Sequence, residues 1–115
     1  MVTLEIKPLT FKEIREYARM CDNGQPCIFD LEVIGRISRV QLKCKELKSL
    51  VKEYYSITIR SLQDDTDYFI VHVDKKLIDE VPKTNDLLYA RGTLFKIDDF
   101  VFLSANKVKI IRLSS

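Results

Sequence analysis

The sequence is poor in the residues that most catalytic and metal sites need. It has no tryptophan, a single histidine (His72), and three cysteines, Cys21, Cys27 and Cys44, with no Cys-x-x-Cys pair. It also has no glycine-rich phosphate loop and no Ser/His or Cys/His pair at a meaningful spacing. Metal and disulfide frameworks need closer and more regular spacings. We therefore expect free thiols, no metal, no cofactor and no enzymatic activity.

Long apolar runs and strong net charge are absent as well. No stretch approaches the length of a membrane span, and the start of the chain has no basic region followed by an apolar one. The formal net charge of the 115 residues is only +2, and an aspartate-rich stretch at 63–67 has the composition of a solvated turn. The sequence thus predicts one domain, no membrane partner and an intracellular location.

Glycine is scarce, and its positions are informative. The chain has three glycines, and two of them, Gly35 and Gly92, sit in the middle of the β-rich segments Leu31–Ile37 and Leu88–Leu94. Glycine weakens a strand and usually marks a bend or a close approach of backbones. Such bends allow a small sheet to close into a barrel.

The N-terminal quarter predicts a helix. Thr10 is a good N-cap with Glu13 three residues later, and Leu9 can form a hydrophobic staple with Ile14. Apolar residues then recur at helical spacing as far as Cys21, where the run Asp22-Asn23-Gly24 stops the helix. Weak alternation over residues 2–7 predicts a short strand ahead of the helix.

From Cys27 onward the apolar period is two. The first strand is expected to turn inward the residues Phe29, Leu31, Val33, Gly35 and Ile37, with a slip of parity near Ser38–Arg39. Residues 43–53 suit either a helical turn or an exposed loop. Alternation predicts a hairpin of two strands that bury Tyr55, Ile57 and Ile59, and Phe69, Val71 and Val73. A short helix over 74–81 and two strands, 87–97 and from Phe100 onward, complete the chain.

Three segments resemble known strands. Leu31-x-Val33-x-Gly35-x-Ile37, Leu88–Leu94 and Phe100–Ala105 with Val108 and Ile110 are similar to strands one, four and five of nucleic-acid-binding OB domains. The resemblance is to the replication-protein-A-like, tRNA-anticodon-type group, with small telomere-capping OB subunits as kin. It implies an all-β, five-stranded Greek-key barrel with a short helix between strands three and four. The barrel spans 26–113 of a single domain, 1–115, and residues 1–25 form an N-terminal extension.

The resemblance implies binding of single-stranded DNA or RNA, with DNA expected, in replication, repair or genome maintenance. The charges agree, because residues 36–52 carry six cations against Glu46 alone, a local net charge of +5. The cations are Arg36, Arg39, Lys43, Lys45, Lys48 and Lys52. A solvated lysine-rich loop is the alternative use of this segment.

Rings on which bases can stack are the second requirement of such a site. Alternation turns Tyr68 and His72 outward on the third strand, Tyr54 and Arg60 on the second, and Tyr89 and Arg91 on the fourth. We expect these residues to contact the nucleic acid. The alternative is that Tyr54 and Tyr89 close the ends of the barrel.

Outward apolar residues support a second hypothesis. Ile34, Leu62, Ile70 and Phe102 all face outward by alternation, and exposed apolar patches often mark partner surfaces. The chain is then a scaffold subunit that contacts another OB-fold protein or a replication or repair enzyme. Neither hypothesis involves a small-molecule substrate.

Overall fold

The computed structural model describes residues 10–47 and 50–113, and it begins with a short helix. In α1 (Phe11–Ala18), Thr10 and Glu13 form the predicted capping box: the Thr10 hydroxyl accepts from the Glu13 amide, and the Glu13 carboxylate accepts from the Thr10 amide. The helix ends before Cys21, earlier than expected. The predicted strand at 2–7 and the Leu9 staple lie outside the described residues. The described part of the chain contains no helix long and apolar enough to cross a membrane.

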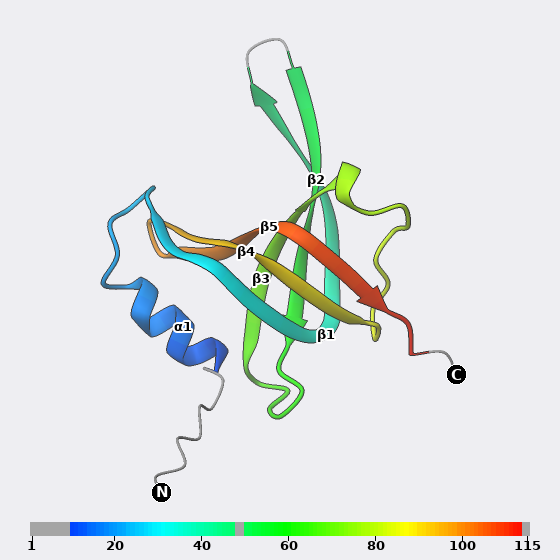
Figure 1. Ribbon diagram of the computed structural model, residues 1–115, viewed down its shortest axis with the longest axis horizontal. Coiled ribbons are helices and arrows are strands. Elements are labelled where there is room, and N and C mark those ends of the chain that lie inside the picture. Colours follow the sequence, from blue (N-terminus) through cyan, green and yellow to red (C-terminus); the bar gives the residue numbers. More distant parts are fainter. Residues whose placement is uncertain (1–9, 48–49, 114–115) are drawn as a thin grey trace, which may run out of the picture.

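Five strands form a closed barrel in the order β1-β2-β3-β5-β4 (Figure 1). Their bounds are β1 (Pro26–Leu47), β2 (Leu50–Arg60), β3 (Tyr68–Asp74), β4 (Leu87–Ile97) and β5 (Phe100–Ile111). All neighbouring pairs are antiparallel except β3 with β5, which is parallel. This arrangement confirms the predicted five-stranded barrel. The helix predicted over 74–81 is wrong in length: only a 3-10 turn, η1 (Lys75–Leu77), follows the N-cap Asp74.

The two mid-strand glycines lie where backbones approach closely. Gly35 pairs with Leu88 of β4, and at the next residue, Arg36, β1 ends its pairing with β4 and begins to pair with β2. A Cβ there would lie 2.7 Å from the Arg60 carbonyl oxygen, and a Cβ at Gly92 would lie 2.8 Å from Ala105 Cα. Only glycine fits these contacts without a backbone shift. The predicted slip of parity is confirmed by a register shift between Ile37 and Arg39.

A second irregularity in β1 corrects one inward prediction. The register with β4 shifts between Ile28 and Leu31, and Asp30 has a left-handed φ of 55°. This bulge reverses the parity of the residues before it. Phe29, expected in the core, is therefore 70% exposed.

The described residues of this segment, 43–47 and 50–53, form strand and neither a helical turn nor a loop, contrary to both expectations. They continue β1 and β2 as a hairpin arm, which we define as residues 43–47 and 50–53. Its register runs from Lys43 opposite Tyr54 to Leu47 opposite Leu50. The arm projects well beyond the barrel (Figure 1). Its strands are held by cross-strand hydrogen bonds and not by burial, so the apolar alternation that marks other strands is absent here.

The core confirms the alternation predicted for β2 and β3. The inward residues Ile57, Ile59, Phe69, Val71 and Val73 are at most 1% exposed. Helix α1 covers one end of the barrel through Phe11, Ile14 and Ala18, and the Phe11 ring lies 5.4 Å from the Phe69 ring. Burial of this helix face explains its single apolar stripe.

The prediction of three free cysteines is wrong. Cys21 and Cys27 form a disulfide with a Cα–Cα distance of 5.7 Å, and Cys44 is free and exposed. The chain reverses between α1 and β1 at Gly24, which has a φ of 77°. That turn brings together two thiols whose spacing matches no common framework.

Candidate nucleic-acid interface

A cationic groove lies on the outer face of β1, β2 and β3. We call it the arginine groove: a hollow of about 450 Å³ lined by Ser38, Arg39, Thr58, Arg60, Tyr68 and Ile70. Beyond the slip at Ser38, Arg39 lies opposite Thr58, and Arg60 lies opposite Tyr68 on the next strand. Alternation turns these side chains outward because Ile57, Ile59 and Phe69 face the core. The groove thus collects polar and aromatic side chains from three adjacent strands.

Like charges face each other at one end of this groove. Arg36 and Arg60 are direct cross-strand partners, and Arg39 follows on the same strand as Arg36. None of the ion pairs within residues 10–47 and 50–113 involves these three arginines. The Arg60 guanidinium instead donates to the Asp65 backbone carbonyl at 2.8 Å. Directly opposed like charges destabilise a sheet unless an anion binds between them.

Tyr68 lines the arginine groove, and Arg15 of α1 contacts both its ring and its backbone carbonyl. The residue is 45% exposed, and the Arg15 guanidinium lies over its ring, 4.8 Å from the ring centroid. Arg15 also donates to the Tyr68 carbonyl and pairs with Asp67 at 3.2 Å, and the Asp67 carboxylate accepts from the Phe11 amide at 2.9 Å. Arg15 covers one face of the ring, so the other face is the one on which a base can stack.

An aromatic cluster adjoins the groove on the same outer surface. His72 lies at its centre, with ring centroids 4.3 Å from Phe102, 5.0 Å from Tyr54 and 5.8 Å from Phe100. Phe95 joins at 5.8 Å from Phe102. The cluster is therefore Tyr54, His72, Phe95, Phe100 and Phe102, drawn from four strands. Sequence reasoning assigned neither Phe95 nor Phe100 a role, although Phe100 shares the outward parity of Phe102.

Burial keeps the central histidine neutral. Desolvation, followed by the charge of nearby Lys43, lowers the pKa of His72 to about 4. Its Nε2 atom is buried and has no hydrogen-bond partner among the described residues. At neutral pH His72 is thus an uncharged ring in a stack, so it does not attract phosphate by charge.

The arm adds cations next to the cluster. Lys43 lies opposite Tyr54, and Lys45 lies opposite Lys52. Lys52 is paired with Asp74 at 3.1 Å, and the ion pairs of the described chain include neither Lys43 nor Lys45. Lys48 lies outside the described residues. The arm therefore offers two lysines outside these ion pairs, and one of them, Lys43, lies opposite Tyr54.

Two expected site residues lie elsewhere on the barrel. Tyr89 and Arg91 are on β4, whose neighbours are β1 and β5. Arg91 pairs with Asp30 at 3.6 Å, and partial desolvation and the nearby Glu32 carboxylate raise the pKa of Tyr89. The structure does not bring these two residues to the arginine groove, because β4 leaves β1 before the groove begins.

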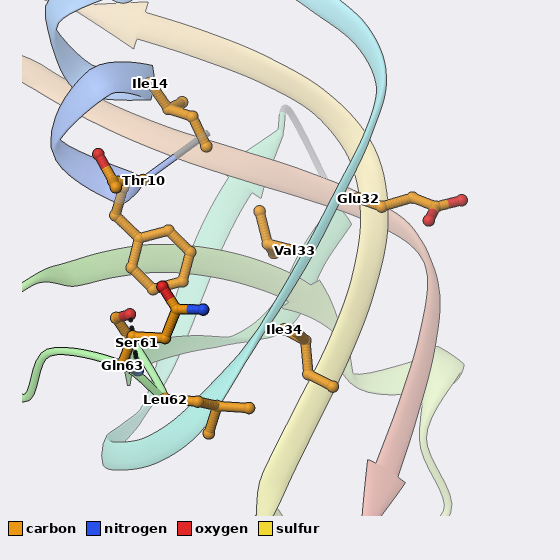
Figure 2. A pocket seen from close by; sticks show the side chains of 9 residues that line it. Thr10, Ile14, Glu32, Val33, Ile34, Ser61, Leu62 and Gln63 are labelled. Atoms are coloured by element: carbon orange, nitrogen blue, oxygen red, sulfur yellow. Dashed lines mark hydrogen bonds between the residues drawn. The ribbon is translucent and has the colours of Figure 1, made fainter. Parts of the chain in front are cut away.

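A separate apolar pocket lies between α1, β1 and the loop after β2 (Figure 2). It has a volume of about 190 Å³, and its lining includes Phe11, Ile14 and Val33. Ile34 and Leu62 lie at its margin, 43% and 49% exposed. The four apolar residues expected to form one partner surface therefore lie in three places. Ile34 and Leu62 lie at this pocket, Ile70 lies in the arginine groove, and Phe102 lies in the aromatic cluster.

Comparison with solved structures places this geometry in a known fold. The chain is similar to the OB domain of Ta0387 from Thermoplasma acidophilum, determined in solution by NMR, with a TM-score of 0.55 and 18% identity over 84% of each chain. No protein-family model and no curated protein matches the sequence. A likeness at this identity concerns the fold alone. The five-stranded barrel and this structural neighbour together show that the chain has the OB fold.

Proposed function

We propose that this OB domain binds single-stranded nucleic acid on the outer face of β1, β2 and β3. The observation that carries the proposal is the opposed pair Arg36–Arg60, which has no acidic partner in the described chain and lies beside an open groove. Guanidinium groups bind phosphate in bidentate geometry. In this proposal the phosphate backbone of the bound strand runs from these arginines toward Lys43 and Lys45 on the arm.

Bases in this proposal contact the rings beside the cations. Tyr68 offers one free face, and the aromatic cluster offers Tyr54 and Phe100 on the same surface. Stacking on aromatic rings requires unpaired bases, so a duplex is a poor ligand. Single-stranded DNA is the ligand that we propose, in a non-catalytic role in replication, repair or genome maintenance. An intracellular location is part of the same proposal. The Cys21–Cys27 disulfide argues against it, because disulfides are rare in reducing compartments.

The test is a titration of labelled oligonucleotides of one sequence as single-stranded DNA, RNA and duplex DNA, at low and high salt. We expect single-stranded DNA to bind best and binding to weaken as salt rises. The double variant Arg39→Gln/Arg60→Gln should bind less tightly. Arg19→Gln, at the exposed C-terminal end of α1, removes a charge by the same substitution and is the matched control. If no oligonucleotide binds at low salt, the proposal is wrong.

A specific observation also favours the scaffold hypothesis. Ile34 and Leu62 are exposed beside the apolar pocket of Figure 2, on a surface separate from the arginine groove. A protein partner that covers this pocket would bury both residues. Ile34→Asp should then abolish recovery of the partner from the native source, while oligonucleotide binding is unchanged. A partner recovered equally well with this variant would exclude the pocket as its docking site.

A further inference from the structure

The arginine groove meets a second groove at Ser38 and Arg60, the two residues that line both. This second groove, which we call the loop groove, has a volume of about 580 Å³. Its lining is Arg36, Ile37, Ser38, Arg60, Asp65, Thr84 and Asn85. Arg36 lines the loop groove, Arg39 lines the arginine groove, and Arg60 lines both, so the three arginines meet at one junction.

The loop groove is walled by a loop that is fixed to β1. The Asn85 amide donates to the Ile37 carbonyl at 2.8 Å, and the Ile37 amide donates to the Asp86 carbonyl at 2.8 Å. Asn85 has a left-handed φ of 76°, a conformation that asparagine tolerates better than most residues. These bonds fix the loop that contributes Thr84 and Asn85 to the wall of the loop groove.

A carboxylate enters the lining at the same place. The arginine groove is lined by Arg39 and Arg60 with no acidic residue, whereas in the loop groove Asp65 stands beside Arg36 and Arg60. A phosphodiester strand that continued through the loop groove would place its next phosphates near Asp65 and the fixed loop, both of which line that groove. Like charges repel, so the path suits the end of a strand better than its middle.

We propose that the junction of Arg36, Arg39 and Arg60 binds the terminal phosphate of a single strand. A terminal phosphomonoester carries a charge of about −1.5 to −2 at neutral pH, whereas each internal phosphodiester carries a single charge. Three guanidinium groups without acidic partners in the described chain match the monoester better. This inference rests on the proposed function and assigns the orientation of the strand, with its end at Ser38 and its interior toward the arm.

The test compares three oligonucleotides of one sequence with an internal fluorescent label. One carries a 5′-phosphate, one a 3′-phosphate, and one has hydroxyl groups at both ends. We expect one of the two phosphorylated forms to bind about 10-fold more tightly than the unphosphorylated form. A factor of this size corresponds to one additional charge-assisted hydrogen bond. The advantage should grow from pH 5 to pH 7, because the second pKa of the monoester is about 6.

Variants separate this site from binding in general. Arg36→Gln should abolish the advantage of the terminal phosphate, whereas Arg19→Gln should keep it. Asp65→Asn keeps the backbone carbonyl that accepts from Arg60, and it should raise the affinity of the unphosphorylated strand and shrink the advantage. Circular dichroism of each variant checks that the barrel is folded.

The outcomes distinguish the two proposals. Equal affinities of the three oligonucleotides, with binding itself intact, would overturn the end site and leave the proposed function standing. Absence of binding by all three at low salt would overturn the proposed function and this inference together. An advantage that survives Arg36→Gln would place the terminal phosphate elsewhere.

Discussion

The salt dependence of oligonucleotide binding is the most direct quantitative consequence of the outer-face charges. Five cations on this face belong to none of the ion pairs of residues 10–47 and 50–113. They are Arg36, Arg39, Lys43, Lys45 and Arg60. Lys52 is already paired with Asp74 and is therefore not one of these five. Each phosphate neutralised on a single strand contributes a slope of about −0.7 to the logarithm of affinity against the logarithm of salt.

If all five cations contact phosphates, the slope is about −3.5, and affinity falls about 100-fold between 50 and 200 mM salt. The double variant Arg39→Gln/Arg60→Gln should reduce the slope by about 1.4, and Lys43→Gln/Lys45→Gln should reduce it by a similar amount. Fluorescence anisotropy at several salt concentrations measures each slope. Lys107→Gln, on the exposed part of β5, is the control for the lysine pair.

Three results would contradict this reasoning. A wild-type slope near zero would mean that binding releases no counterions, and the arginines would then have no role in it. A slope that is unchanged in the arginine variant but reduced in Arg19→Gln would move the interface away from β1, β2 and β3. A slope reduced only in the lysine variant would confine the phosphates to the arm.

Three further predictions concern single residues. Tyr68→Ala should weaken oligonucleotide binding by about 1–3 kcal/mol in the same titration, and a loss of thermal stability alone would return the ring to a structural role. Gly92→Ala should lower the free energy of unfolding by about 3 kcal/mol, because the new Cβ would meet the Ser104 carbonyl and Ala105 Cα; urea denaturation that shows no change would contradict the close approach. His72 has a pKa of about 4 when folded and about 6.5 when unfolded, so the unfolded state binds more protons between these values and stability is lost as pH falls through this range. We expect the free energy of unfolding to fall by about 1–2 kcal/mol over this range, given the partial exposure of the ring. This pH dependence should disappear in His72→Phe. An equal pH dependence in both proteins would assign the effect to carboxylates.

The sequence predicted those parts of the fold whose signal is local. Alternation on β2 and β3 identified the buried faces correctly, since the period of two follows directly from the pleat of a strand. Gly35 and Gly92 marked close approaches, and the slip near Ser38 marked the bulge that follows the change of β1 from β4 to β2. The arm escaped prediction because its strands pair in solvent, where apolar residues need not alternate.

The candidate site was predictable only in its composition. The cationic stretch from Arg36 to Lys52 and the outward position of Tyr68 could be read from the residues. Their arrangement could not be read from the residues, because it depends on the register between strands. Arg36 lies opposite Arg60, another cation, whereas Lys52 forms an ion pair with Asp74. Tyr89 and Arg91 looked equivalent to the others and lie on a different part of the barrel.

The sequence by itself determined that this chain forms a small closed barrel with a cationic segment after its first bend. Only the tertiary structure decided which charges of the described residues stay outside ion pairs, which rings join His72 in one cluster, and which cysteines form a disulfide. The physical reason is that secondary structure follows from neighbours along the chain. Ion pairs, ring stacks and disulfides depend on residues that are far apart in sequence and adjacent only after strands have paired.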